Sequence, residues 1–297
     1  QSLCGETMQR WIVRMAEIQL KSRPVRRHMR VALERQLKAQ AELRGVELSL
    51  QPWHGLLLAH APADSDPEAA ADAFRHTFGI VAIDPAEQVE AAPESVADAL
   101  EAGGFPEGVG STFAIRCRRH GPKGEWGSQQ FAAALGAEVQ RRAPHLEVDL
   151  GEPDWEVRVA LMPDYASLLA ERIPGPGGLP TGVQGNVSAN LADESDLLAA
   201  WLVMRRGCRI LLDERADPAL QARLTAWDAA LADEGWALKL NSGPGPGHAG
   251  RVWGRVGADL DEFEAADDRN VPLVRLEPLA GWSEARLTEL KHRFGIA

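Results

Sequence analysis

Residues 187–209 read VSANLADESDLLAAWLVMRRGCR, and their hydrophobic pattern predicts a strand, a turn and a helix. Such a turn binds a pyrophosphate when it contains glycines, because backbone N–H groups at the helix start can then approach the anion. This turn contains no glycine and offers Asp193, Glu194 and Asp196 instead. Two like charges about 4 Å apart repel by roughly 4 kcal/mol at an effective dielectric near 20. We therefore predict an enzyme-like domain that has lost its nucleotide. The degenerate loop comprises Leu191, Ala192, Asp193, Glu194, Ser195 and Asp196.

The three acids of this loop also have a structural explanation, which we favour. Acids in the first turn of a helix accept hydrogen bonds from its orphan N–H groups and interact well with its dipole. A divalent-cation site is the alternative, since hard cations take carboxylate oxygens. Elsewhere the eight histidines are dispersed and the three cysteines show no C-x-x-C spacing, so we predict no metal site and no disulfide framework.

Two of the cysteines, Cys117 and Cys208, have arginine neighbours in sequence. Nearby cations lower a thiol's pKa and would make either cysteine a nucleophile. Each also falls in a predicted strand, where small buried residues are common, and neither has a cysteine partner close by. We interpret both as structural and predict no catalytic residue.

Length and composition indicate a soluble globular protein of two or three domains. The chain has 297 residues, of which 45% are hydrophobic and 25% charged. No apolar run approaches the roughly 20 residues that cross a bilayer, and no signal-type segment opens the sequence. We therefore expect a cytoplasmic location and no membrane partner.

The distribution of charge says more than its sum. A formal net charge of -11 argues on its own against a polyanionic partner. Basic residues, however, concentrate at 10–44 and 116–123, while acids dominate 64–107 and 259–268. This segregation predicts a basic face on an acidic body. Scattered, solvated charges are the alternative.

The alternation of apolar residues predicts an α+β first half. The first part reads as strand 10–17, helix 25–44 and strands 46–51 and 55–60. The second part reads as helix 67–78, strand 80–84, helix 93–102, strand 112–119, helix 129–142 and strands 146–150 and 155–161. The turn GEPD separates the last two strands in a hairpin pattern.

Glycine and proline crowd residues 173–182, which indicates a linker. Beyond it, strands alternate with helices, which is typical of a parallel, helix-covered α/β sheet. A Gly/Pro insert at 242–250 joins two strands where a helical crossover is expected, so we predict a shortened sheet. The predicted boundaries are 8–66 and 67–172 for the first two domains, 173–186 for the linker and 187–297 for the third domain.

Two groups of cations are candidate RNA-binding sites. The first combines phosphate-binding side chains with a ring that could stack on an unpaired base. Its members are Arg116, Arg118, Arg119, His120, Lys123 and Trp126. The second lies at a helix start, where positive charge opposes the helix dipole and so invites an anion. Its members are Lys21, Arg23, Arg26, Arg27 and Arg30. A solvated strand edge and neutralising acids elsewhere are the respective alternatives.

Five blocks of the sequence resemble the tRNA 4-thiouridine synthetases and occur in the order found in that family. They are AEIQLKS with VRRHM (16–29), FAIRCRRHGPKGEWGSQQF (113–131), GGLPTGVQG (177–185), LVMRRGCRI (202–210) and PLVRLEPLAGW (272–282). The resemblance implies an N-terminal ferredoxin-like domain, a THUMP domain and a Rossmann-like domain of the PP-loop ATPase (ATP-pyrophosphatase) type.

The resemblance also implies a partner and a chemistry. Family members bind the acceptor end of tRNA with the first two domains, adenylate a uridine with ATP and magnesium, transfer sulfur through cysteine persulfides, and often dimerise. The RNA-facing positions of the family fall on Lys21, Arg26, Arg116, Arg118, Arg119 and His120. Where the family has a Ser-Gly-Gly-x-Asp-Ser loop, this chain reads LADESD.

From these residues we predict a tRNA-binding pseudoenzyme with no bound cofactor, acting in or beside tRNA modification. One alternative is an active tRNA sulfurtransferase that works with a partner protein. Another is an adaptor that delivers tRNA to a sulfurtransferase or a different modification enzyme. A usable thiol together with nucleotide binding would favour the active enzyme.

Overall fold

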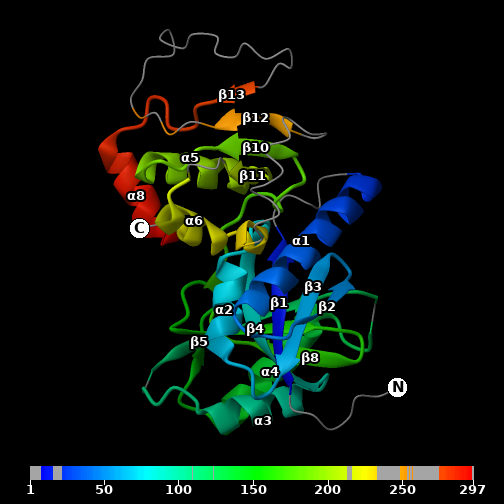
Figure 1. Cartoon of the computed structure of the whole chain (residues 1–297). Coiled ribbons are helices and arrows are strands. Elements are labelled where there is room, and N and C mark those ends of the chain that lie inside the picture. The colour runs from blue at the N-terminus through cyan, green and yellow to red at the C-terminus, as the bar shows by residue number, and fades with distance from the viewer. Residues whose placement is uncertain are drawn as a thin grey trace. The chain divides into compact units, whose positions relative to one another are not determined.

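A computed structural model describes residues 8–15, 22–108, 110–122, 124–212, 216–232, 248–252, 254, 256 and 274–295 (Figure 1). The chain divides into two compact units. The first comprises 1–13, 49–64 and 83–173, and the second 14–48, 65–82 and 174–297. Among the described helices, none combines the length and the apolar character that a bilayer crossing requires.

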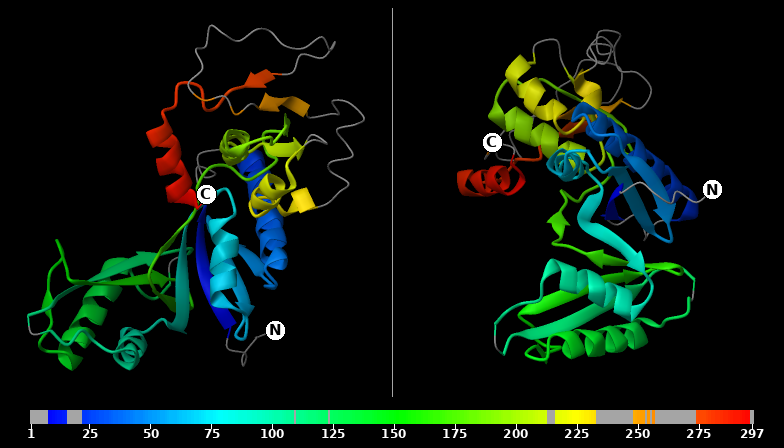
Figure 2. Two further views of the ribbon diagram at one scale, coloured as in Figure 1. Left: turned by 60° about the vertical axis from the view of Figure 1, so that its left-hand side comes forward. Right: turned by 90° about the horizontal axis from the view of Figure 1, so that it is seen from below.

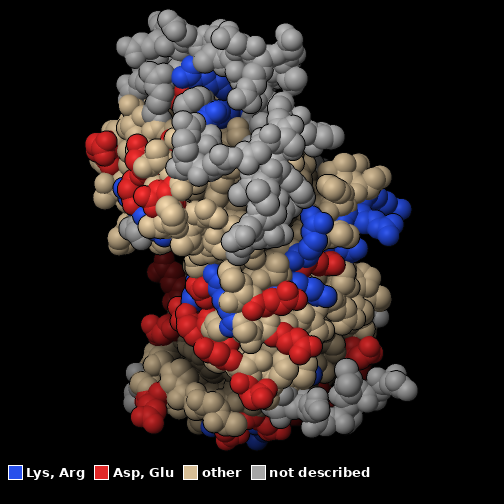
Figure 3. Space-filling model, in the orientation of Figure 1, with Lys and Arg blue, Asp and Glu red and all other residues tan. Residues whose placement is uncertain are grey.

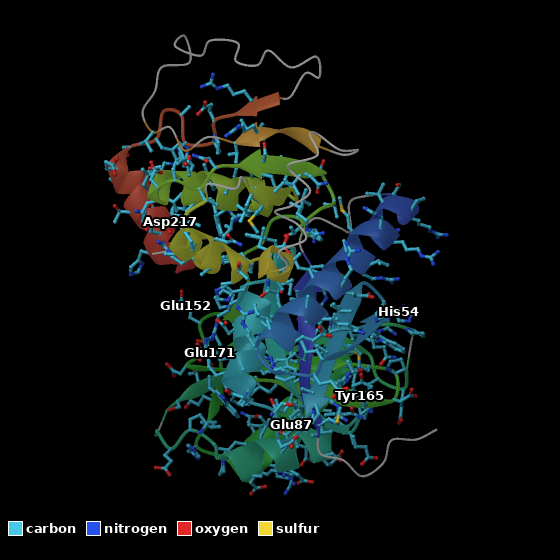
Figure 4. The ribbon with its side chains drawn as sticks, in the orientation of Figure 1. His54, Glu87, Glu152, Tyr165, Glu171 and Asp217 are labelled. Atoms are coloured by element: carbon cyan, nitrogen blue, oxygen red, sulfur yellow. The ribbon has the colours of Figure 1, made fainter. Side chains whose placement is uncertain are left out.

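The first unit contains most of a nine-stranded sheet. Its strands are β1 (Met8–Met15), β2 (Ser49–Trp53), β3 (Leu56–Pro62), β4 (Ile80–Glu90), β5 (Thr112–Arg119), β6 (Glu147–Val148), β7 (Trp155–Leu161), β8 (Tyr165–Leu169) and β9 (Ile173–Pro174). They run in the order β2-β3-β1-β4-β8-β7-β5-β6, and β9 pairs with β4. His54, labelled in Figure 4, lies in the turn between β2 and β3 with a φ of 39°.

Two helices pack against the β5–β7 part of this sheet. They are α3 (Pro93–Gly103) and α4 (Ser128–Arg142), which lie side by side (Figure 2). Phe131, Leu135 and Val139 follow one another at four-residue spacing and are fully buried. This stripe on α4 packs into the same apolar core as Phe113 of β5, so the strand and the helix are fixed together.

The predicted hairpin between the strands at 146–150 and 155–161 is wrong. Both β6 and β7 pair with β5, in parallel and on opposite edges of it. The connecting turn is bonded to the start of β5, because the Asp154 carboxylate accepts hydrogen bonds from the N–H and the hydroxyl of Thr112 at 2.9 Å each. Strands β8 and β9 were not predicted.

The second unit contains a four-stranded sheet in which every pair is parallel, as predicted. Its strands lie in the order β11 (Arg209–Leu212), β10 (Asn186–Ala189), β12 (His248–Val252) and β13 (Val274–Leu276). The described helices of this unit are α1 (Arg23–Leu43), α2 (Pro67–Arg75), α5 (Glu194–Arg205), α6 (Pro218–Thr225), the 3-10 turn Ala229–Ala232 and α8 (Glu284–Phe294). Helix α8 was not predicted. Asp217, labelled in Figure 4, caps the start of α6.

An aromatic cluster forms the core of the second unit. Trp201 is fully buried and Trp227 is 4% exposed. Phe78 stacks on Trp227 with ring centroids 5.1 Å apart and meets Trp201 edge-on at 5.4 Å. Trp236 and residues 242–247 of the Gly/Pro insert lie outside the described residues.

Candidate nucleic-acid interface

Successive side chains of β5 point to opposite faces of the sheet, as in any strand. Phe113, Ile115 and Cys117 belong to or border the apolar core under α4. Arg116 and Arg118 fall on the opposite face and are exposed. This separation is incomplete, because Ala114 on the second face is fully buried, and Arg119, the last residue of β5, is exposed although it falls on the face of Phe113.

Not all members of the first predicted cation group face solvent equally. The Arg116 guanidinium donates to the Glu156 carboxylate at 3.0 Å and to the Leu150 carbonyl at 2.9 Å. His120 is 8% exposed, and its backbone N–H donates to Leu161. Arg116 thus has its charge neutralised within the chain, and His120 offers little surface to a ligand.

Arg118 and Arg119 are the accessible cations of this group. Both are exposed, and neither side chain forms an ion pair with any residue the structure describes. The Arg119 backbone N–H donates to the Ser128 hydroxyl at 3.1 Å, which ties the end of β5 to the start of α4. Lys123 lies outside the described residues.

Arg119 and Trp126 line a pocket of about 280 Å³. The Trp126 indole is half-buried because its ring meets Phe131 edge-on at 5.8 Å. Carboxylates complete the pocket, from Glu90, Glu125 and Asp164. The arrangement offers a cation for a phosphate, a ring for stacking and acceptors for amino groups.

The second predicted cation group lies on α1. Ser22 precedes this helix without a side-chain capping bond, and the first turn has no acid to offset the dipole. Arg27 is exposed, whereas Arg26 is half-buried and Arg30 pairs with Glu34 at 3.2 Å. Lys21 lies outside the described residues.

The structure adds two exposed cations of α1 that were not predicted, Arg35 and Lys38. In Figure 3, Lys and Arg side chains gather at the upper right, over the part of α1 that is drawn there in Figure 1. The missed signal was the helical spacing from Arg27, since residues eight and eleven positions later return to the same face.

Two of the three acids at the start of α5, Asp193 and Asp196, accept hydrogen bonds from backbone N–H groups, which confirms their structural interpretation. Asp193 is the N-cap and accepts from the Asp196 N–H at 2.9 Å. One oxygen of Asp196 accepts from the Ala192 N–H at 3.0 Å, and the other from the Gly254 N–H at 2.9 Å. A Cβ on Gly254 would lie 2.2 Å from the Asp196 nitrogen, so this backbone covers the helix start.

Glu194 points to cations of its own unit. Its carboxylate pairs with Arg223 and lies 3.5 Å from the Lys291 ammonium. The hydrogen bond from Arg223 is the main reason that the pKa of Glu194 is lowered. Leu191 is fully buried with a φ of 47°, and its carbonyl accepts from the Asp217 N–H at 3.0 Å. The loop is therefore held on both sides by internal bonds.

The two described cysteines have the properties of structural thiols. Burial raises the pKa of Cys117 to about 11 and also raises the pKa of Cys208. Their arginine neighbours in sequence do not reverse this effect, because desolvation disfavours the thiolate. Neither is a ready nucleophile at neutral pH.

Family models match both parts of the first half. A ThiI ferredoxin-like domain model matches residues 10–83, and a THUMP domain model matches residues 91–171. The chain is therefore a THUMP-domain protein with an N-terminal ferredoxin-like domain and a C-terminal α/β domain. The exact domain boundaries stay predictions.

Curated relatives show which family of THUMP-domain proteins this chain belongs to. A protein named "Probable tRNA sulfurtransferase" from Methanothermobacter thermautotrophicus is 36% identical over 213 residues, covering 67% of this chain and 51% of the relative. One with the same name from Halobacterium salinarum is 30% identical over 235 residues, covering 75% and 58%. The chain belongs to the tRNA 4-thiouridine synthetase family. It spans about half the length of the curated relatives it matches.

Solved structures share the fold over nearly the whole chain. The PH1313 protein from Pyrococcus horikoshii has a TM-score of 0.77 at 25% identity, covering 97% of this chain and 99% of that one. A 4-thiouridine synthetase solved with RNA and ATP has a TM-score of 0.73 at 19% identity, covering 98% and 86%. At 19% identity, the similarity to this 4-thiouridine synthetase shows a shared fold alone.

Proposed function

We propose that this chain binds tRNA through the β5 surface of its THUMP domain. The observation that carries the proposal is the exposure of Arg118 and Arg119 within the residues that match the THUMP model. Neither guanidinium is neutralised by an acid in the described part of the chain, so both can contact phosphates.

The pocket beside Arg119 suggests which part of tRNA binds there. RNA-binding proteins recognise unpaired ends, whose bases can stack on aromatic rings. Trp126 presents the exposed part of its indole to this pocket. The unpaired 3′ end of the acceptor stem is therefore the proposed ligand.

We also propose that the loop at the start of α5 does not hold ATP. A phosphate at a helix start needs backbone N–H groups that are open to it. Here Asp193 already accepts from the Asp196 N–H in the first turn of α5, and the Asp196 carboxylate accepts from the Ala192 N–H in the preceding loop and from the Gly254 N–H beside it. A triphosphate would have to displace both carboxylates and then tolerate their charge.

A second candidate function is an active tRNA sulfurtransferase. The names of the relatives favour it. Under this hypothesis a partner protein supplies the activated sulfur, because burial keeps Cys117 and Cys208 protonated. Micromolar binding of ATP with magnesium would favour this candidate.

The RNA proposal is tested by titrating a fluorescent tRNA with the protein. Charge reversal at Arg118→Glu with Arg119→Glu should weaken binding by at least about tenfold, equivalent to roughly 1.4 kcal/mol. The control is Arg141→Glu with Arg286→Glu, which reverses two exposed charges on α4 and α8. Equal affinities for the wild type and the β5 variant would refute the site.

A further inference from the structure

A cavity in the second unit has a basic lining, although the chain as a whole is acidic. Its volume of about 700 Å³ lies in the range of small-molecule sites. The basic residues that line it are Arg75, His76 and Arg205, and none of its described lining residues is acidic. In a chain with a net charge of -11, such a lining creates a local positive potential that suits an anion.

The other walls of the cavity are apolar and fixed in place. They come from Val81, Pro174, Pro176 and Trp227 and from the two glycines of the same loop. The N–H of Gly175 donates to the Val81 carbonyl at 2.8 Å, and that of Gly177 donates to the Ile80 carbonyl at 2.7 Å. A Cβ on Gly175 would lie 2.3 Å from the Ile80 carbonyl oxygen, so this close approach requires glycine. A preformed apolar wall favours a rigid ligand, because neither partner has to be ordered on binding.

The two arginines of the cavity are placed to meet a carboxylate. The Arg205 Nε donates to the Pro176 carbonyl at 3.0 Å, which fixes this half-buried side chain beside the loop. The Arg75 guanidinium pairs with Glu68, but the side chains of this pair are 40% and 75% exposed. An exposed ion pair contributes little stability, so a ligand can replace Glu68. A planar guanidinium binds a carboxylate through parallel hydrogen bonds.

The backbone of the cavity disfavours a phosphate group. Phosphate sites usually add open backbone N–H groups to their cations. Here the N–H groups of Gly175 and Gly177 already donate to carbonyls, and Pro174 and Pro176 have none. Burial lowers the pKa of His76, so this residue adds no third charge at neutral pH. The lining therefore suits a ligand with a single carboxylate better than a nucleotide.

We propose that this cavity, bounded by Arg75, Val81, Arg205 and Trp227, binds a small carboxylate that has a rigid apolar body. The carboxylate pairs with the arginines, and the apolar body lies against the wall formed by the loop and Trp227. The inference goes beyond tRNA binding and does not depend on it. All described lining residues belong to the second unit, whereas Arg118 and Arg119 belong to the first.

A pair of ligands that differ only in charge tests the chemical class. The probe is 2-naphthoate, and its amide has nearly the same shape without the charge. Ligand-detected NMR titration of the whole chain should show saturable binding of 2-naphthoate at about 1 mM or tighter, as its size allows. The amide should bind at least about tenfold more weakly, because it lacks the charge-assisted hydrogen bonds. Equal affinities for the two ligands, or no saturable binding of 2-naphthoate, would overturn the proposal.

Charges introduced at Val81 test the location. Val81→Glu should weaken binding of 2-naphthoate about threefold, and Val81→Lys should strengthen it by a similar factor, as expected for charges about 6 Å apart in water. Val148→Glu and Val148→Lys are matched controls. Val148 is 51% exposed and Val81 49%, and both lie on strands, but Val148 belongs to the first unit. Equal shifts at the two positions would place the ligand elsewhere and refute the cavity.

Removing the internal partner of Arg75 gives an independent test. Glu68→Gln should tighten binding of 2-naphthoate by about two- to fivefold, because Arg75 then has no competing carboxylate. Glu138→Gln, which removes a carboxylate from Arg141 in the first unit, should leave the affinity unchanged. A Glu68→Gln protein that binds no more tightly than the wild type would contradict the role of Arg75 and with it the proposed site.

Discussion

Asp196 acts as an internal anion at the start of α5. Its two oxygens accept from N–H groups on opposite sides, one in the preceding loop and one at Gly254. In a loop that binds a nucleotide, N–H groups of this kind would point at phosphate. A single side chain thus joins two separate segments and at the same time fills the helix start.

Removing this carboxylate should destabilise the second unit. Asp196→Ala leaves two N–H groups without their acceptor, which costs about 1–3 kcal/mol where water does not replace it. Asp196→Asn retains one acceptor and should lose less. Urea unfolding measures the change, with Glu289→Ala on the exposed face of α8 as control. An Asp196→Ala protein as stable as the control would contradict the internal-anion interpretation.

The thiol of Cys117 should react slowly at ordinary pH. With its pKa raised from 9.0 to about 11, the thiolate fraction at pH 8 falls by roughly 100-fold. In a protein whose other cysteines are serine, alkylation by iodoacetamide should be slower by this factor in the native state than in denaturant. Its rate should rise about tenfold per pH unit towards pH 11. A native rate within a few-fold of the denatured rate would contradict the assignment.

At the scale of elements, His76 is the C-cap of α2, and its protonation makes the stability of this part of the chain depend on pH. The His76 ring lies 4.6 Å from the Trp227 ring, and its Nδ1 lies 2.9 Å from the Asp72 carbonyl oxygen. Burial is the main cause that lowers the pKa of His76 from 6.5, and it outweighs the favourable effect of Asp72. The folded protein therefore keeps this side chain neutral.

The sign of the pH dependence follows from that pKa. Above the unfolded value of 6.5 the histidine is neutral in both states, and no stability is lost. As the pH falls below 6.5, the unfolded state binds the proton first, so the wild type loses stability. His76→Gln should remove this part of the acid dependence in urea unfolding between pH 7.5 and 5.5. Identical pH profiles for the two proteins would contradict the assignment.

Elements with a strong local signal were predictable, whereas their partners were not. The helix at 25–44, the strand at 112–119 and the parallel sheet of the second unit agree with the structure because each repeats a clear period. The hairpin failed because alternation identifies a strand without saying which neighbour pairs with it. In the same way, the sequence places cations on α1, but packing decides that Arg35 faces solvent and Arg26 is half-buried.

At the scale of the whole molecule, the family was predictable from ordered sequence blocks, but the site was predictable only in part. Arg118 and Arg119 are exposed as expected of a binding surface. The pairing of Arg116 with Glu156 depends on the register of β5 against β7, which no local pattern contains. The burial of His120 depends equally on contacts between elements distant in sequence.

The net charge gives the molecule a further property that can be measured. Because the chain carries -11 overall, RNA binding depends on local basic surfaces and should weaken steeply with salt. With Arg118 and Arg119 both in contact, two phosphates neutralised would give a slope of about 1.4–1.8 log units per log unit of salt. Anisotropy titrations between 50 and 300 mM salt measure it, and a flat profile would exclude phosphate contacts as the source of affinity.

The most direct measurement is a calorimetric titration in two stages on the wild-type protein. ATP with magnesium is added first, up to millimolar concentration, and tRNA is then added to the same cell. We predict no binding heat from the nucleotide and a saturable signal from the RNA. Micromolar binding of ATP, or no binding of tRNA, would contradict a tRNA-binding protein whose α5 loop is filled by its own carboxylates.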